Sequence, residues 1–349
     1  MSIKRRIKRI LFIMLVIMAG FYLLTKITPD SMKEMTGGFA DAAKDIQPKK
    51  IVEMSGKEPI VLFCPRDDCG LNLEYLINKS SKVHCAVFDL DLENVISALQ
   101  RKDALVVVDG DNYQKAWANN SAFKNFRHDK SSPYMHNKFC IFDDSIITTG
   151  SFNPTHNCDE KNNNNEVIIF SKTLAQNYEA EFQELWNGKF GGGEKVKNPV
   201  VEVDNITIEN YFCPEDFCAN HVLEALSKAN KSIYFMTFSF THDKIGDMLV
   251  KKHKEGVDVK GVFEKSQESQ YSESQKLNQS GIPIRMDTNK AKMHHKVFII
   301  DKEIVVTGSF NPSSNADTEN DENIVIIHDA DIARGFLQEF EMVWNAPTP

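Results

Sequence analysis

Apolar and polar positions change along residues 58–346 in a pattern that predicts strands and helices in turn. Short apolar runs rich in Val, Ile and Phe predict strands, and runs with apolar residues three and four positions apart predict helices. Expected helices are 71–78, 92–100, 221–229 and 243–252, and expected strands include 83–91, 104–109, 167–170, 233–241, 257–264 and 325–328. The alternation favours an α/β fold with helices packed on sheets.

The order of these elements occurs twice. Each half opens with a cysteine-containing segment, FCPRDDC at 63–69 or FCPEDFC at 212–218. Each closes with a helical segment, EFQELWN at 181–187 or EFEMVWN at 339–345. Two repeats are too few for a solenoid, which needs about three or more, so we expect two similar lobes related by a pseudo-two-fold axis, each a mixed sheet flanked by helices.

The glycine and charge of KFGGGEKVKNP at 189–199 are typical of a linker. The sequence therefore predicts a first domain at 58–190, a linker at 191–205 and a second domain at 206–346.

The first 29 residues differ from the rest. An apolar run at 10–24 follows five basic residues, and no acidic residue precedes Asp30. This pattern predicts an N-terminal transmembrane anchor at 1–29, with its basic end in the cytoplasm and the domains outside, followed by a tether at 30–57. Fifteen apolar residues are short beside the ~20 of a spanning helix, so a cleaved signal peptide and a secreted protein, or a buried helix, remain open.

Composition describes an ordinary globular protein. The 349 residues are 42% hydrophobic and 26% charged, with a net charge of −8 and a pI of about 5.7. An acidic chain of this kind argues against a dedicated, high-affinity nucleic-acid binder. It does not exclude an enzyme that meets nucleic acid through a local basic region.

Four of the seven cysteines occupy repeated positions, Cys64 and Cys69 in one half and Cys213 and Cys218 in the other. In an exported domain each pair could close a local disulfide, while free thiols and a zinc site remain alternatives. The other three are expected to be unpaired: Cys85 and Cys140 as core residues of apolar strands, and Cys158 as a loop thiol.

One twenty-residue stretch carries the candidate chemistry and is repeated without a gap. It reads MHNKFCIFDDSIITTGSFNP at 135–154 and MHHKVFIIDKEIVVTGSFNP at 293–312. Side chains two apart on a strand share a face, so each His points the same way as the Lys two positions on. A Gly-Ser turn returns an Asn towards them, with the Ser in support. The candidate site residues are His136, Lys138, Ser151 and Asn153, with His294, Lys296, Ser309 and Asn311.

Asp143 and Asp301 lie seven positions after the histidines, on the opposite strand face. We expect these carboxylates to order the following turn and to support the fold.

Two histidines, two lysines and two asparagines suit a phosphate diester. The lysines can neutralise the non-bridging oxygens as a metal ion does elsewhere. One imidazole can attack phosphorus and form a phosphohistidine, while the other protonates the leaving oxygen and then activates water. We expect neither metal nor cofactor, because the adjacent lysines would repel a cation.

The pattern H-x-K-x4-D-x6-G-S-x-N resembles the duplicated HKD signature of the phospholipase D superfamily, and the resemblance covers about 58–346. The opening segments look most like the bacterial nuclease and mitochondrial cardiolipin hydrolase branch. The resemblance implies metal-independent phosphodiester cleavage through a phosphohistidine on His136, with both motifs in one site. A single chain would then be functional as a monomer.

Relatives continue with N-x-E-N, whose Glu orients the catalytic imidazole. The second copy fits, with Glu322, whereas the first reads Asn-Asn-Asn-Asn at 162–165, with Glu166 two positions late. We predict that Glu322 supports His294 as proton donor and that an amide supports His136, the attacking residue. Alternatively, Glu166 could reach His136.

Substrate is predicted less sharply. The expected membrane anchor and the negative net charge favour a phospholipid head-group ester. Basic and aromatic residues at 123–134, with Lys290 and Lys292, keep DNA or RNA as the alternative. A catalytically inactive, phosphate-binding scaffold is the third possibility.

Overall fold

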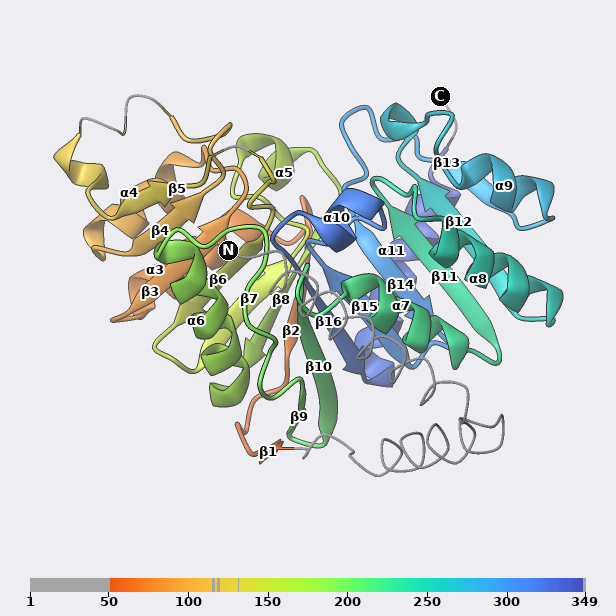
Figure 1. Ribbon diagram of the computed structural model, residues 1–349, viewed down its shortest axis with the longest axis horizontal. Coiled ribbons are helices and arrows are strands. Elements are labelled where there is room, and N and C mark those ends of the chain that lie inside the picture. Colours follow the sequence, from red (N-terminus) through yellow and green to blue (C-terminus); the bar gives the residue numbers. More distant parts are fainter. Residues whose placement is uncertain (1–50, 115–116, 118–119, 131, 348–349) are drawn as a thin grey trace, which may run out of the picture. The chain divides into compact units, whose positions relative to one another are not determined.

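The computed structural model describes residues 51–347, apart from positions 115–116, 118–119 and 131 (Figure 1). Its strands form two mixed sheets, one in each half of the chain, and helices cover them. The predicted α/β architecture of two similar lobes is confirmed.

The first lobe has a seven-stranded sheet in the order β2-β8-β7-β6-β3-β4-β5. Its strands are β2 (Ile60–Cys64), β3 (Val83–Val87), β4 (Leu105–Val108), β5 (Phe126–His128), β6 (Lys138–Phe142), β7 (Ile146–Gly150) and β8 (Asn164–Phe170). The helices are α3 (Cys69–Lys79), α4 (Glu93–Arg101), α5 (His156–Glu160) and α6 (Lys172–Trp186), with a 3-10 turn η1 at Ser121–Phe123.

The second lobe repeats that order and adds two strands at one edge, giving β1-β9-β10-β16-β15-β14-β11-β12-β13. Its strands are β1 (Ile51–Glu53), β9 (Val200–Val203), β10 (Ile206–Cys213), β11 (Ser232–Thr237), β12 (Asp258–Phe263), β13 (Ile284–Met286), β14 (Lys296–Ile300), β15 (Ile304–Gly308) and β16 (Glu322–His328). The helices are α7 (Cys218–Ser227), α8 (Asp243–Lys254), α9 (Ser274–Gln279), α10 (Ser314–Thr318) and α11 (Ala330–Asn345), with η2 at Lys265–Gln267.

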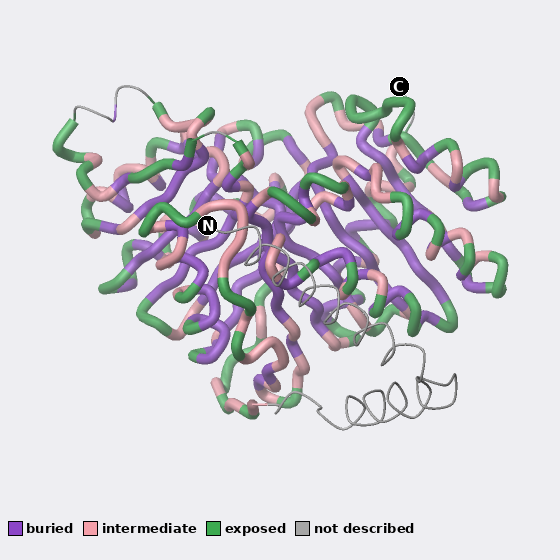
Figure 2. The backbone as a smooth tube through the Cα atoms, in the orientation of Figure 1, coloured by how far each residue is buried: buried purple, intermediate pink, exposed green. Residues whose placement is uncertain are grey.

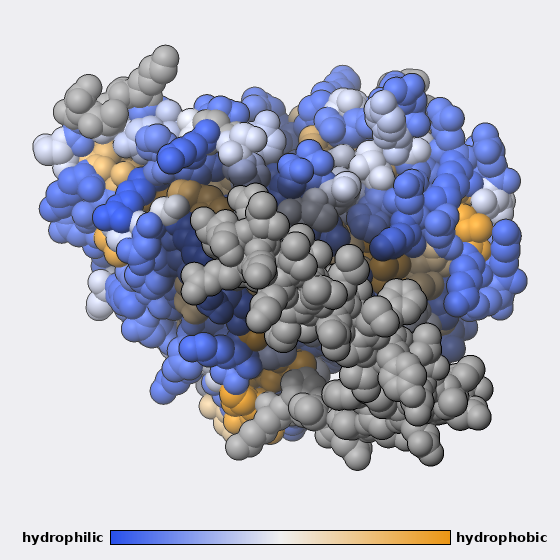
Figure 3. Space-filling view, in the orientation of Figure 1, coloured by the Kyte–Doolittle hydropathy of each residue, from blue (hydrophilic) through white to orange (hydrophobic). Residues whose placement is uncertain are grey.

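The lobes share one apolar core. Inner-face residues of both sheets, such as Phe139 and Val297, pack with Tyr178 of α6 and Phe336 of α11 in a single buried cluster. Two further clusters lie under the outer helices, α3 and α4 in the first lobe and α7 and α8 in the second. The buried central strands explain the nearly continuous apolar runs in the sequence (Figure 2). On the face of the molecule shown in Figure 3, most of the surface formed by the described residues is hydrophilic.

The closing helices begin at capping residues that the sequence specifies. Ser171 Oγ accepts a hydrogen bond from the backbone N–H of Leu174 at the start of α6, and Asp329 Oδ1 accepts from Ile332 N–H at the start of α11. Such caps satisfy backbone donors that a helix leaves free. α6 begins two residues after β8, and α11 begins two residues after β16.

The chain at β1 contacts both lobes, although residues 51–53 fall within the expected tether. β1 pairs in parallel with β9 in the second sheet. The Glu53 side chain contacts the first lobe, where it accepts hydrogen bonds at the start of α6, from Ser171 Oγ (2.6 Å) and Thr173 N–H (2.8 Å). This short strand thus links the two lobes.

The predicted transmembrane helix has to be corrected. Within the described ranges, no helix is long and apolar enough to cross a membrane, and α11, the longest of them, has 16 residues against the ~20 required. The stretch 1–29, on which the prediction fell, lies outside the described residues. The localisation that depended on this anchor, with the domains held outside the cytoplasm, loses its support with it.

The described residues contain three disulfides, of which two match one of the predicted alternatives and the third was not predicted. Cys64–Cys69 and Cys213–Cys218 close the two local loops as one alternative predicted. Cys85 and Cys140 are also bonded, contrary to prediction, because they face each other on β3 and β6 with Cα atoms 4.1 Å apart. Cys158 is a free thiol, but it is buried on α5 and does not lie in a loop.

Candidate active site

The two motifs meet where β6 and β14 begin. His136 N–H donates to the carbonyl of Asp321 (2.9 Å), and His294 N–H donates to the carbonyl of Asn163 (2.8 Å). Each bond runs from one lobe to the other, as do the isolated bridges beside them. The backbone itself therefore brings the two histidines together, as the repeat suggested.

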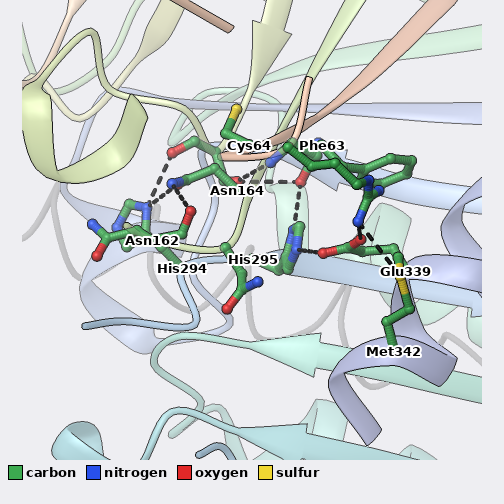
Figure 4. A network of polar contacts seen from close by, with 12 residues as sticks. Phe63, Cys64, Asn162, Asn164, His294, His295, Glu339 and Met342 are labelled. Atoms are coloured by element: carbon green, nitrogen blue, oxygen red, sulfur yellow. Dashed lines mark hydrogen bonds and ion pairs between the residues drawn. The ribbon is translucent and has the colours of Figure 1, made fainter. Parts of the chain in front are cut away.

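Each imidazole is oriented through Nδ1 by a side chain from the other lobe. His136 Nδ1 lies 2.8 Å from Glu322 Oε2. His294 Nδ1 lies 2.8 Å from Asn164 Oδ1 and 3.1 Å from the Ser151 carbonyl (Figure 4). Nε2 is left as the nitrogen of each ring that can meet a substrate.

These partners reverse the predicted ones. Glu322 supports His136, and an amide supports His294, because β8 and β16 each begin against the opposite lobe. Asn164 faces Cys64 in the β2–β8 pair, and Glu322 faces Cys213 in the β10–β16 pair. Asn164 is therefore the structural counterpart of Glu322.

Glu166 does not take the place that the alternative gave it. It is buried two positions further along β8, where it faces Gly150 and contacts Thr148. Nδ1 of His136 is already paired with Glu322. The nearby glutamate of the first copy thus belongs to the core.

The two lysines lie in matching positions. Lys138 Nζ donates to the carbonyl of His136 (2.7 Å), and Lys296 Nζ donates to that of His294 (2.8 Å). Each amine also lies over a phenylalanine ring, at 4.9 Å from the Phe88 centroid and 4.8 Å from that of Phe238.

Phe88 and Phe238 are site residues that the sequence reasoning missed. Their rings meet the imidazoles edge-on, with centroids 4.6 Å from His136 and 4.7 Å from His294. Each follows directly on the strand next to a motif strand, β3 or β11. The recurrence of Phe at both strand ends was the signal in the sequence.

The serines of the Gly-Ser turns fix the ends of β8 and β16. Ser309 Oγ donates to Glu322 Oε2 (2.6 Å) and accepts from Asn323 N–H (2.9 Å). Ser151 Oγ donates to Asn165 Oδ1 (3.2 Å) and accepts from the N–H of the same residue. Ser309 thus positions the carboxylate that supports His136.

The two asparagines follow these turns but differ in their contacts. Asn153 is buried, and its Oδ1 has no hydrogen-bond partner within the described residues. Asn311 is half-buried, and its Oδ1 accepts from the N–H of Ser239, next to Phe238. Contact of either amide with a substrate stays a prediction.

Asp143 and Asp301 lie at the far ends of the motif strands. Asp143 Oδ1 accepts from the N–H groups of Ser81 and Lys82, at 2.8 and 2.9 Å. Asp301 Oδ1 accepts from those of Lys231 and Ser232, at 2.7 and 2.8 Å. Both carboxylates anchor the loop that enters β3 or β11, in keeping with the structural role read from their strand parity.

Burial and like charge act together on the titratable groups. Burial, reinforced by both lysines, lowers the pKa of His136 and of His294 well below the usual range. Burial also lowers the pKa of Lys138 to about 8 and raises that of Glu322 to about 8. An anionic group bound between the lysines would relieve this crowding of cations.

A second layer of contacts lies behind the motifs, from the residue between His and Lys. Asn137 accepts from Asn323 Nδ2 (2.7 Å), whereas His295 Nδ1 lies 3.1 Å from Asn165 Oδ1. His295 Nε2 also meets Glu339 Oε1 at 3.2 Å (Figure 4). Asn137 Nδ2 donates to Glu181 Oε1 of α6 (3.3 Å), so each of these two residues connects its motif strand to a closing helix.

Comparison with known proteins identifies the family of this chain. Residues 73–186 and 222–344 match the family described as cardiolipin synthase, PLD-like domain. A mitochondrial cardiolipin hydrolase of Chlamydomonas reinhardtii is 35% identical over 124 residues, which are 35% of this chain and 56% of that protein. A phospholipase D of Rickettsia typhi is 33% identical over 142 residues, 40% of this chain and 70% of that protein.

A solved structure gives the same picture of the fold. The phosphatidylserine synthase of Haemophilus influenzae matches 82% of this chain and 86% of its own, with a TM-score of 0.59 and 12% sequence identity. At this identity the likeness concerns the fold alone.

Fold and site together define a protein with two PLD-like lobes whose two His-x-Lys motifs meet in one site. The chain belongs to the PLD-like family, within the phospholipase D superfamily.

Proposed function

We propose that this protein is a metal-independent phosphodiesterase that works through a phosphohistidine. One observation carries the proposal: two imidazoles from different lobes, each oriented through Nδ1, lie beside two buried lysines. The lysines supply the positive charge that a phosphate diester needs, without requiring a metal ion.

In the first step Nε2 of His136 attacks phosphorus. The N–P bond forms as the P–O bond to the leaving group breaks, and the leaving oxygen takes a proton from Nε2 of His294. The imidazole gains positive charge as it bonds to phosphorus. In its ionised form Glu322, 2.8 Å from Nδ1, stabilises that charge, and this supports His136 as the nucleophile.

In the second step His294, now neutral, removes a proton from water. The water oxygen bonds to phosphorus, the N–P bond breaks and a phosphate monoester leaves. His136 is neutral again, and His294 carries the proton for the next turnover. Lys138 and Lys296 offset the charge on the non-bridging oxygens in both steps.

The substrate that we propose is a phospholipid head-group ester. The relatives named cardiolipin hydrolase and phospholipase D support this choice. The chain's net charge of −8 disfavours long-range attraction of nucleic acid.

Hydrolysis of nucleic acid is the second candidate, because of a cavity of about 790 Å³ next to the second motif. Lys265, Lys290 and Lys292 line it together with Glu264 and Asp287, and Lys292 is two residues from His294. The three lysines could bind a further phosphate of a strand.

The deciding experiment compares the purified full chain on vesicles of phosphatidylcholine, vesicles of cardiolipin, single-stranded DNA and bis-p-nitrophenyl phosphate. We expect release of a phosphate monoester product, fastest from a lipid, and acid-labile phosphate trapped on His136. His136→Asn should abolish turnover, and EDTA should leave it unchanged. Turnover that survives His136→Asn, or that EDTA removes, would contradict the mechanism; fastest cleavage of DNA would replace the lipid by the second candidate.

A further inference from the structure

The two histidines are held by chemically different groups at equivalent positions. Asn164 and Glu322 occupy the same place in their sheets, and each approaches the opposite histidine at 2.8 Å. The contact distances match, so the two supports differ in the charge that they can carry: Glu322 is negative once it ionises, whereas Asn164 stays neutral at every pH. An amide oxygen accepts the Nδ1–H bond but adds no negative charge.

The groups around His294 are cationic or neutral. Lys296 on its own strand, Lys138 from β6 and His136 across the site are the charges that act on it most strongly. The Ser151 carbonyl, at 3.1 Å, is its second oxygen partner. The nearby carboxylates, Glu322 and Glu264, act on the lysines, and Glu322 is bonded to His136.

We propose that Asn164 is a positioning residue that orients His294 without adding negative charge. His294 is therefore protonated, and able to donate a proton, only in acidic solution, and turnover is confined to lower pH. This inference rests on the proposed function, in which His294 protonates the leaving oxygen. It adds that one amide sets the pH range of the first step. A carboxylate at that position would make both histidines alike and would extend activity towards higher pH.

The amide also makes His294 a stronger acid than a carboxylate-supported histidine. The protonated form is scarcer at neutral pH, but each molecule that carries the proton gives it up more readily. A substrate with a poor, alkoxide leaving group depends on this proton. A substrate such as bis-p-nitrophenyl phosphate, whose leaving group is stable as an anion, does not.

Asn164→Asp is the direct test, because it keeps the side-chain shape and adds one negative charge. In the full chain, kcat/KM with an alkyl phosphodiester falls as the pH rises. The pH at which it falls should be roughly one to three units higher in Asn164→Asp than in the wild type. With bis-p-nitrophenyl phosphate the profile should move far less. Asn164→Ala should lower kcat without this displacement, because it adds no charge while it removes the orienting contact and the bonds from Nδ2 to the carbonyls of Cys158 and Asn162.

Asn162→Asp is the matched control for added charge. The Asn162 side chain bonds Cys158 Sγ and the N–H of Lys292, whereas the Nδ1 partners of His294 are Asn164 and Ser151, so the Asn162 variant should displace the profile much less. Histidine NMR provides a readout that needs no substrate: the pKa of His294 should rise in Asn164→Asp more than in Asn162→Asp.

A folded Asn164→Asp protein in which neither the His294 titration nor the alkyl-ester profile moves would overturn the inference. Absence of phosphodiesterase activity in the wild type would instead refute the proposed function, and the NMR titration would still report on Asn164. The two failures are thus distinguishable.

Discussion

Glu166 shows what a single buried carboxyl does to this fold. It is 5% exposed, burial raises its pKa to about 8, and its Oε2 has no hydrogen-bond partner within the described residues. Its counterpart in the second lobe is Ile324, a core residue. A carboxyl in such a place favours the folded state only while it is protonated.

We predict that Glu166→Gln stabilises the protein in alkaline solution. The folded pKa is about 8 and the ordinary value is 4.5, so Glu166 binds a proton more tightly in the folded state. Its contribution to stability is full below about pH 4.5 and is lost as the pH rises through about 8. Urea unfolding should show the variant more stable by roughly 1–3 kcal/mol at pH 9 and little changed at pH 5. An equal change at both pH values would contradict this origin.

Strand parity explains which residue roles the sequence could predict. The period of two placed His136 beside Lys138 and turned Asp143 away, and the structure agrees. Parity says nothing about which lobe supplies a partner, so the supports of the two histidines were exchanged. The Cys85–Cys140 bond was missed for a similar reason, because pairing between β3 and β6 is a long-range property.

At the scale of elements, the loops that precede α3 and α7 occupy equivalent positions but carry residues of opposite charge at one of them. Arg66 pairs with Glu339 of α11 at 3.0 Å. Its counterpart in the FCPEDFC segment is Glu215, which meets Glu181 and Glu184 of α6, with carboxylate oxygens within 4.8 Å of one another. Burial, followed by repulsion from neighbouring carboxylates, raises the pKa of both Glu181 and Glu215.

Glu215→Arg should therefore recreate the ion pair of the other lobe. Because the raised carboxyl pKa values cost stability as the pH rises, the gain should be larger at pH 8 than at pH 5. Arg66 is half-exposed, so solvent screening limits the expected gain to about 1 kcal/mol at pH 8. Thermal unfolding checks this, with Arg66→Glu as the reciprocal control that should destabilise. A Glu215→Arg protein that unfolds more easily at pH 8 would refute the analogy.

The elements themselves were predictable where an apolar pattern was long. The helices at 71–78 and 243–252 correspond to α3 and α8, and the strands at 167–170 and 325–328 to β8 and β16. Short edge strands such as β1 and β13, with three residues each, are too brief to establish a period. Their pairing depends on neighbours distant in sequence.

At the scale of the whole molecule, each lobe completes the other. The first lobe supplies His136 and Asn164, and the second supplies His294 and Glu322, so each imidazole and its support come from different halves. The shared core and β1 keep the halves together. Both motifs meet within one chain.

Specific activity should accordingly not depend on protein concentration. One chain contains both histidines, both lysines and both supporting side chains, so we predict a functional monomer. Turnover per chain should remain constant across a dilution series, while sedimentation velocity reports the species present. A loss of specific activity on dilution that parallels dissociation would show that a second copy is required.

The exchange of partners between lobes has a consequence for how this site could change over generations. The internal repeat is the mark of a duplicated gene segment. Each of the two resulting lobes supplies the side chain that supports the histidine of the other lobe, as two copies of a one-motif chain would. In a pair of identical chains, any substitution enters both supports at once. After fusion, one support can become an amide while the other stays a carboxylate. The difference between Asn164 and Glu322 could therefore arise in a single chain that encodes both halves, and not in a pair of identical chains.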